Sequence, residues 1–276
     1  VGYKLSVDKV NLSFLANASY VKNEIKNLGN QTGYIDKESL PTLGTVSRNQ
    51  NGYPIGYFFG YKAIGVFQTQ EEIDNYISPA TGKPIQPNAV PGDTKFEDLN
   101  GDGVISDDNE DRTMIGKPNP DWMVGLTVAA DWNGFDLSAF FQGSFGADVF
   151  DALRRYELAA VNYTSDALER WTGPGTSNSM PRIVLGDTPK NFRPSTLLVH
   201  DASFLRLRNL QVGYTLPAQL TRKAYIQRLR FYASFDNLLT ITGYKGMDPE
   251  IGSTMGIDKG VYPQARVYTC LLYTSP

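Results

Sequence analysis

Apolar and polar side chains alternate along several stretches of the chain. From residue 122 to 130 every second side chain is apolar: Trp122, Val124, Leu126, Val128 and Ala130. From residue 135 to 145 the same holds for Phe135, Leu137, Ala139, Phe141 and Phe145, with Asp136, Ser138, Gln142 and Ser144 between them. Successive side chains of a strand point to opposite faces, so this period of two predicts β-strands with one apolar and one polar face.

Five further stretches have a similar pattern and are also predicted to be strands: residues 10–22, 53–67, 203–216, 229–236 and 262–273. The apolar positions change parity near Asn209, between Leu207 and Leu210, which a β-bulge would explain. Helical turns are predicted at residues 69–77, 151–161 and 165–171. The chain is therefore expected to be all-β.

The predicted connections differ in length. The connections 132–134 and 217–227 are short, whereas the segments 23–52, 68–121, 146–202 and 239–261 are long. Long loops are uncommon in compact soluble domains, while outer-membrane barrels have short turns at one end and long loops at the other. We therefore favour a large antiparallel transmembrane barrel with 68–121, 146–202 and 239–261 at one end. Segment 23–52 does not fit this scheme, and a soluble sandwich or barrel with inward apolar faces would have the same period.

In a barrel of this kind the apolar face of the strands meets lipid and the polar face lines the lumen. Six side chains are then expected to face outward: Phe135, Leu137, Phe141, Leu229, Phe231 and Phe235. Arg228 and Arg230 must face the lumen, because a cation on the lipid face costs about 2–4 kcal/mol near the midplane. Asp136 and Asp236 are the candidate partners of these arginines.

Composition narrows the function classes. The 276 residues suffice for one large domain or two small ones, and the net charge of −3 gives no basic surface for nucleic acid. The single cysteine, Cys270, excludes an internal disulfide framework. No apolar run approaches the roughly 18 residues of a membrane helix, whereas barrel strands need only about 9–11. The chain opens on Val1 without a signal peptide, so we interpret it as a fragment.

The stretch FEDLNGDGVISDDNEDR, residues 96–112, has the spacing of a calcium loop. Positions 1, 3, 5, 6 and 8 of an EF-hand-type loop are matched by Asp98, Asn100, Asp102, Gly103 and Ile105. The candidate Ca²⁺ ligands are Asp98, Asn100, Asp102, Val104, Asn109 and Glu110. Prolines on both sides disfavour flanking helices. The alternative is a solvated loop whose Asx side chains bond their own backbone.

No residue pattern identifies an enzyme. His200 is the only histidine, and neither a nucleophile-elbow nor an HExxH motif lies near it. Glu157 and Glu169 could serve glycoside hydrolysis, which needs a paired acid and base, but nothing in the sequence pairs them. We therefore expect no catalytic residues.

Seven stretches resemble the C-terminal part of the SusC/RagA family of TonB-dependent outer-membrane transporters, in the order in which that family has them. They are GYPIGYFFGYKAIGVFQTQEEID, PGDTKFEDLNGDGVISDDNEDRTMIGKPNPDWMVGL, GFDLSAFFQGSFGADVF, ALERWTGPGTSNSMPRI, DASFLRLRNLQVGYTLP, LRFYASFDNLLTITGYKGMDPEI and YPQARVYT, and they cover most of residues 53–269. The resemblance implies that the chain is the C-terminal portion of a wide barrel in the bacterial outer membrane. The family's plug and TonB-contacting segment are not in this chain.

The resemblance also implies import of oligomeric nutrients, with glycans favoured over peptides. It implies two partners, the TonB complex and a SusD-like surface lipoprotein that acts as a lid. Loop aromatic residues are then candidates for contact with substrate or lid: Trp171, Tyr156, Tyr163 and Tyr244. The rival functions are a soluble all-β calcium-binding module, carbohydrate-binding or adhesive, and an enzyme.

The end of the chain departs from the family. The last strand of these barrels usually ends in an aromatic residue, whereas this chain ends in CLLYTSP. We expect the tail from about Cys270 to be non-native, and we expect no functional role for Cys270.

Overall fold

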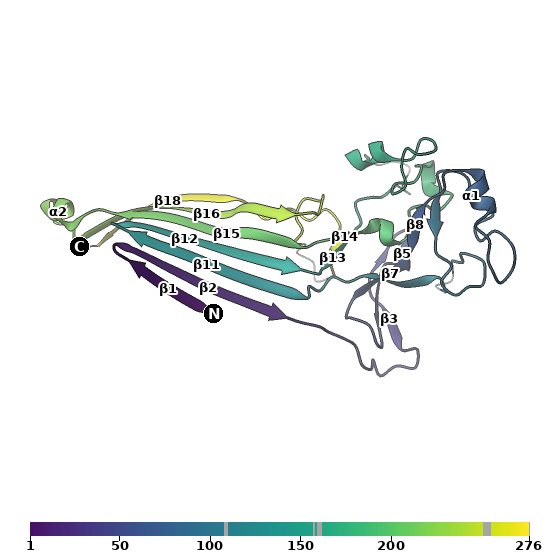
Figure 1. Ribbon diagram of the computed structural model, residues 1–276, viewed down its shortest axis with the longest axis horizontal. Coiled ribbons are helices and arrows are strands. Elements are labelled where there is room, and N and C mark those ends of the chain that lie inside the picture. Colours follow the sequence, from purple (N-terminus) through teal and green to yellow (C-terminus); the bar gives the residue numbers. More distant parts are fainter. Residues whose placement is uncertain (108–109, 157, 159–161, 251–254, 276) are drawn as a thin grey trace.

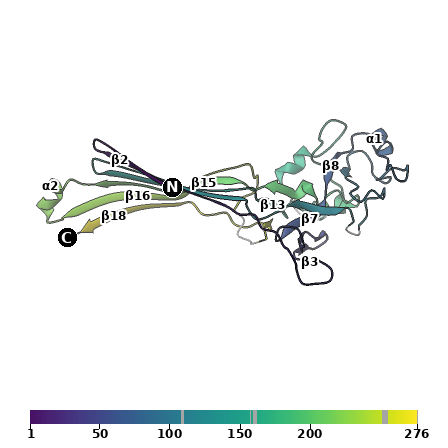
Figure 2. The same cartoon turned by 60° about the horizontal axis from the view of Figure 1, so that its bottom comes forward.

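The computed structural model of the chain describes residues 1–107, 110–156, 158, 162–250 and 255–275. The long strands form one sheet, and the short strands and loops gather beyond one end of it (Figure 1). A view turned by 60° shows the sheet as a thin single layer (Figure 2). We call this sheet the wall, and the material beyond its end the loop layer.

The wall is a seven-stranded antiparallel sheet in the order β1-β2-β11-β12-β15-β16-β18. Its strands are β1 (Gly2–Val7), β2 (Val10–Tyr20), β11 (Trp122–Trp132), β12 (Phe135–Phe145), β15 (Phe204–Thr215), β16 (Arg228–Thr242) and β18 (Val267–Ser275). Each wall strand lies beside the wall strand that precedes it in the sequence. The prediction of an all-β chain is confirmed, although β1 lies outside the predicted strands.

The connections of the wall separate by length, as predicted. The short ones, at residues 8–9, 133–134 and 216–227, lie at one end (Figure 1). The long ones, residues 21–121, 146–203 and 243–266, form the loop layer at the other end. The turns at residues 8–9 and 133–134 have two residues each, and in Asn133–Gly134 both residues have positive φ, as a type I′ hairpin requires. The segment 217–227 holds α2 (Ala218–Thr221) and the 3₁₀ turn η4 (Arg222–Ala224).

Residues 53–67 contain strands, as predicted, but these strands do not belong to the wall. This segment forms β7 (Tyr57–Tyr61) and β8 (Ala63–Val66), both in the loop layer. All five residues of β7 are buried, so it is a core strand without a solvent face, and its apolar run does not truly alternate. As a result, residues 21–121 are one long connection between β2 and β11, which explains why segment 23–52 did not fit a simple turn.

Pairing registers assign every wall residue to one of two faces. On β12 and β15 the cross-strand pairs Phe135–Tyr214 and Leu137–Val212 lie on the apolar face. The six side chains expected to face outward all share this face. Phe135, Leu137 and Phe231 are exposed and the other three are partly exposed. In the described part of the chain no second sheet lies over this face (Figure 2).

Aromatic residues mark both ends of the apolar face. At the end with short turns lie Trp132, Phe135, Tyr214 and Phe231, which neighbouring strands place side by side. At the other end lie Tyr20, Trp122 and Phe145, likewise in register. Two aromatic bands that flank an apolar zone are typical of membrane barrels. This signal is present in the sequence, but it becomes visible only when the strands are paired.

The parity change near Asn209 is confirmed as a bulge. The register between β15 and β16 shifts between Leu207 and Asn209, and the register between β12 and β15 shifts opposite it.

In the described part of the chain, no helix is long and apolar enough to cross a bilayer.

The loop layer is folded around small cores, although the sequence suggests long irregular segments. One core joins Phe58 of β7 to Phe150, Leu198 and Ile257, which are all nearly inaccessible to solvent. Phe58 lies in a small sheet of order β10-β7-β6-β3, and Phe150 and Ile257 lie in another of order β14-β13-β17, which Leu198 directly precedes. Their remaining strands are β3 (Tyr34–Asp36), β6 (Ser47–Gln50), β10 (Arg112–Gly116), β13 (Asp148–Asp151), β14 (Val199–Asp201) and β17 (Ile257–Asp258). The core therefore binds the three long connections into one body.

Two-stranded sheets and short helices complete the loop layer. The sheets pair β4 (Ser39–Leu40) with β5 (Gly44–Thr45) and β8 with β9 (Thr94–Phe96). The helices are α1 (Gln70–Asp74), η1 (Ser165–Glu169), η2 (Leu185–Asp187) and η3 (Thr196–Leu198). Predicted helical turns at 69–77 and 165–171 correspond to α1 and η1. The one predicted at 151–161 is wrong for its described residues, which begin as the end of β13; residues 157 and 159–161 lie outside the described part.

Candidate functional site

The polar face of the wall carries paired charges. Arg230 on β16 donates to Asp136 on β12, with its Nε 3.0 Å and its Nη2 2.5 Å from the two carboxylate oxygens. The predicted partner of this arginine is thus confirmed. Arg228 lies on the same face, because it is two residues away along the strand. Asp236 accepts a hydrogen bond from Asn209 at 2.7 Å.

A four-charge network ties the loop layer to the wall. Arg206 on β15, whose side chain is 2% exposed, donates to Asp248 and, at 3.1 Å, to Glu250. Arg208 on the same strand donates to both oxygens of Glu250. Asp248 also accepts the backbone N–H groups of Glu250 and Gln264, each at 2.9 Å. The connection 243–266 is therefore held against the polar face of β15.

The sequence pattern gives no sign of this network. Asp248 and Glu250 lie in the stretch GMDPE, where nothing about their spacing points to arginines more than 40 residues earlier. Only the alternation on β15, which places arginines on a polar face, hinted that acidic partners were needed.

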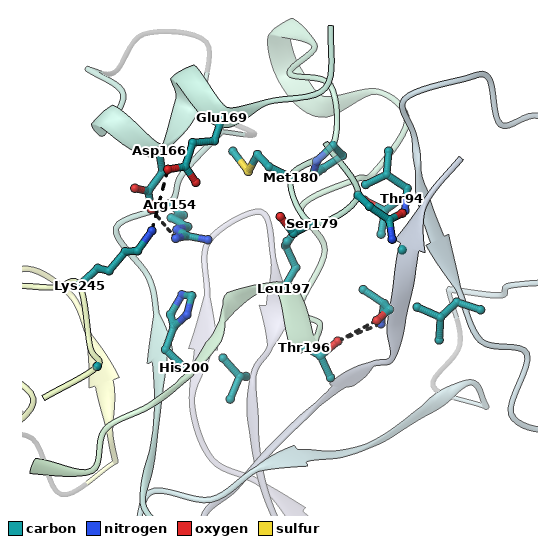
Figure 3. Close-up of a pocket in the computed structure, with 18 residues that line it drawn as sticks. Thr94, Arg154, Asp166, Glu169, Ser179, Met180, Thr196, Leu197, His200 and Lys245 are labelled. Carbon is teal, nitrogen blue, oxygen red and sulfur yellow. Dashed lines mark hydrogen bonds and ion pairs between the residues drawn. The ribbon is translucent and has the colours of Figure 1, made fainter. Parts of the chain in front are cut away.

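A recess of about 530 Å³ opens in the loop layer next to this connection (Figure 3). Charged side chains gather on one side of it: Arg154, Asp166, Glu169 and Lys245, with His200 below them. Its apolar lining consists of Ile64, Val66, Ala63, Met180, Pro181, Leu197 and Val199. We call it the charged recess.

The charged side chains of the recess differ in how firmly their contacts fix them in place. Arg154 lies between Asp151, 3.2 Å from its Nε, and Asp166, to which its Nη2 donates. Its side chain is 12% exposed, so it is fixed in place. Lys245 and Glu169 are about 70% exposed, and their charged atoms are 4.0 Å apart. That pair is loose and accessible to solvent.

His200 is not part of a nucleophile-activating arrangement. It lies on β14, and its Nε2 is 3.7 Å from Asp151 without a hydrogen-bond partner. Burial alone would raise the pKa of Asp151, but His200, the Leu153 amide and the charge of Arg154 together hold that pKa below its usual value. Asp151 is thus an anion that holds Arg154. Glu169 faces Lys245, and Glu157 lies outside the described residues.

In the acidic stretch at 98–111, side-chain oxygens accept hydrogen bonds from the backbone of the same stretch. Asp98 accepts the N–H groups of Gly101 and Gly103, each at 2.8 Å. Asn100 accepts the N–H of Asp102, and Asp102 accepts the N–H of Val104. These are the bonds that the solvated-loop alternative predicts. Across the described residues, no group of three acidic, His or Cys side chains is placed to hold a metal ion.

Four further hydrogen bonds close this acidic loop. The amide nitrogen of Asn100 donates to Asp102 and to Glu110, each at 2.9 Å. Asp111 is fully buried and accepts the N–H groups of Leu99 and Ser106, each at 3.0 Å. Asp111 is therefore the structural anchor of the loop, a role that the calcium spacing did not indicate. The candidate ligand Asn109 lies outside the described residues.

Calcium binding by this loop remains a prediction. If Asp98, Asn100 and Asp102 turn their oxygens to Ca²⁺, calorimetric titration of the purified barrel should show one site, and substitution Asp98→Asn should weaken binding about tenfold or more. Asp74→Asn, in an exposed carboxylate on α1, is the matched control. Absence of heat in the wild type would leave the backbone-bonded loop as the correct interpretation.

The four loop aromatics selected from the sequence differ in exposure. Tyr156 is 1% exposed and packs against Phe192, and Tyr244 is 7% exposed and donates to Asp258 at 2.6 Å. Burial, together with the bond to Asp258, raises the pKa of Tyr244, which keeps its hydroxyl protonated. In this arrangement neither ring can stack on a ligand, because both stabilise the loop layer itself.

The other two aromatics are more accessible. The ring of Trp171 covers Gly92, where a Cβ would lie 2.4 Å from the indole, and its Nε1 donates to Gln68. Tyr163 is 42% exposed. Of the four, Tyr163 is thus the most available for contact with another molecule.

Known proteins resemble most of this chain in sequence and in structure. No family model matches the chain. The TonB-dependent receptor P3 of Formosa agariphila is 34% identical over 231 residues, which are 80% of this chain and 22% of that receptor. The TonB-dependent receptor SusC of Bacteroides thetaiotaomicron is 29% identical over 255 residues, 91% of this chain and 23% of that receptor. The structure of the RagAB peptide transporter matches with a TM-score of 0.74 at 25% identity, covering 99% of this chain and 28% of that chain. This chain thus spans about a quarter of the length of these curated relatives.

Proposed function

Because the chain belongs to the SusC/RagA family of TonB-dependent outer-membrane receptors, we propose that it is the C-terminal part of a transporter for oligomeric nutrients. The observation that carries this proposal is the two-sided wall. One face is apolar between two aromatic bands, and the other holds Arg206, Arg208 and Arg230 with acidic partners. A sheet with these faces suits lipid on one side and an aqueous path on the other.

The loop layer suits the outer surface of the cell. Outer-membrane barrels keep short turns in the periplasm and long loops outside, so the loop layer would meet arriving nutrients. A SusD-like lipoprotein would cover this end, and the TonB complex would act on a part of the transporter that this chain does not contain. RagAB is named a peptide transporter, so peptides are candidate substrates beside the glycans that the family resemblance of the sequence implies.

Uptake can be tested in the organism that carries the full-length gene. Deletion of the gene should reduce the growth yield on the oligomeric nutrient, a glycan or a peptide mixture, at least tenfold. Growth on the corresponding monomers should stay normal. Complementation with the full-length gene should restore growth. Normal growth of the deletion strain on every oligomer tested would refute the proposal.

A further inference from the structure

We propose, building on the transport function above, that the charged recess binds oligopeptides that carry charged side chains next to apolar ones. The recess is a built site, because residues from three separate connections form it: β8 from the first, Arg154 to His200 from the second and Lys245 from the third. Its volume of about 530 Å³ lies in the range of small-ligand sites and suits a few amino-acid residues.

The charged side of the recess offers both signs within a short distance. Lys245 and Glu169 are loosely paired and exposed, so each can exchange its present partner for an opposite charge on a ligand. Arg154 is fixed behind them by Asp151 and Asp166, and these two carboxylates neutralise its charge, so the exchangeable charges of the recess are those of Lys245 and Glu169. A ligand that carries both a cation and an anion can pair with both side chains at once, which a neutral oligosaccharide cannot do.

The apolar lining points to the same ligand class. Ile64 is 49% exposed, and Val66, Met180 and Leu197 continue the apolar surface inside the recess. None of the described residues that line the recess is Phe, Tyr or Trp. Sugar rings are expected to stack on such aromatic rings, and the candidate rings Tyr156 and Tyr244 are buried in the loop layer instead. Aliphatic side chains of a peptide fit this lining better.

The backbone edge beside the recess is already closed. The hydroxyl of Thr196 accepts the N–H of Ala63 at 3.0 Å and donates to its carbonyl, and the Asn178 side chain accepts the N–H of Val66 at 3.1 Å. A peptide would therefore not extend β8 as an additional strand. Recognition would depend on the side chains of the peptide, which makes charge the main determinant of selectivity.

The test uses the full-length transporter in detergent and three probes. Two are capped tetrapeptides, Leu-Lys-Leu-Glu and Leu-Gln-Leu-Gln, and the third is maltohexaose. The double substitution Glu169→Gln with Lys245→Gln should weaken binding of the charged peptide roughly tenfold, in line with the loss of two exposed ion pairs. Binding of the uncharged peptide should stay within about twofold. Lys223→Gln, an exposed lysine at the opposite end of the wall, is the matched control.

A second readout checks that the recess is open in the complete protein. Lys245 should react with an amine-specific acetylating reagent, and the charged peptide should protect it from this reaction. Lack of reaction at Lys245 in the ligand-free transporter would overturn the proposal, because the rest of the protein would then cover the recess. Equal binding of the charged peptide to wild type and double variant would also overturn it, as would binding of maltohexaose in place of both peptides.

These outcomes separate the inference from the transport function. A double variant that binds the charged peptide as the wild type does, in a strain that still needs the gene to grow on oligomers, overturns only the role of the recess. A deletion strain that grows normally on every oligomer refutes the transport function itself.

Discussion

Substitution Asp248→Asn should release the connection 243–266 from the wall. The substitution removes one of the two acidic partners of Arg206, whose guanidinium is buried, and breaking such a pair costs about 3–5 kcal/mol. The local opening of the connection should become easier by a similar amount. Trypsin cleavage at Lys245 and Lys259, measured in the full-length transporter, should accelerate on the order of 100-fold.

Glu97→Gln is the matched control for this substitution. Glu97 pairs with Lys62 at 3.3 Å, but both side chains are more than 40% exposed, so the change in stability should stay below about 1 kcal/mol. Cleavage in Asp248→Asn at the wild-type rate would show that the four-charge network does not hold the connection. Lys245 lies three residues before Asp248, so release of the connection should also weaken peptide binding in the charged recess.

Arginine at position 128 should destabilise the barrel far more than arginine at position 129. Val128 lies on the apolar face of β11, midway between the aromatic bands that contain Trp122 and Trp132. An arginine there costs about 2–4 kcal/mol near the membrane midplane. Ala129 is next to it on the polar face, beside Ser13 and Ser138, where an arginine can be hydrated. Unfolding in denaturant of the full-length barrel, refolded into lipid vesicles, measures both free energies.

Equal destabilisation by Val128→Arg and Ala129→Arg would contradict the assignment of faces. Such a result would mean that both faces meet the same surroundings. A larger effect at position 129 would mean that the two faces are assigned the wrong way round and that Arg206 and Arg230 face lipid.

Some features of the candidate site are visible in the sequence because they depend on a single strand. The alternation in residues 122–130 and 135–145 fixes which side chains share a face, whatever the strands pair with. That rule alone puts Arg230 and Asp136 on the polar face. Their contact across β15 also needs the register of the sheet, which places Gly213, a residue without a side chain, between them. Connections between successive antiparallel strands lie alternately at the two ends of the sheet. Because short and long connections alternate along the sequence, the short ones come together at one end and the long ones at the other.

The tertiary structure decided which residues meet across the loop layer. β7 has the composition of a wall strand, but a core that includes Phe150 and Leu198 buries it on all sides, and these partners lie far away in the sequence. Similarly, Asp248 meets Arg206 only after a turn of the chain that no local pattern specifies. Tyr156 and Tyr244 look like ligand contacts as members of long loops, but they are core residues once those loops pack together. The backbone itself imposes the period of a strand, residue by residue, whereas a contact between distant segments depends on how all of them fill space at once.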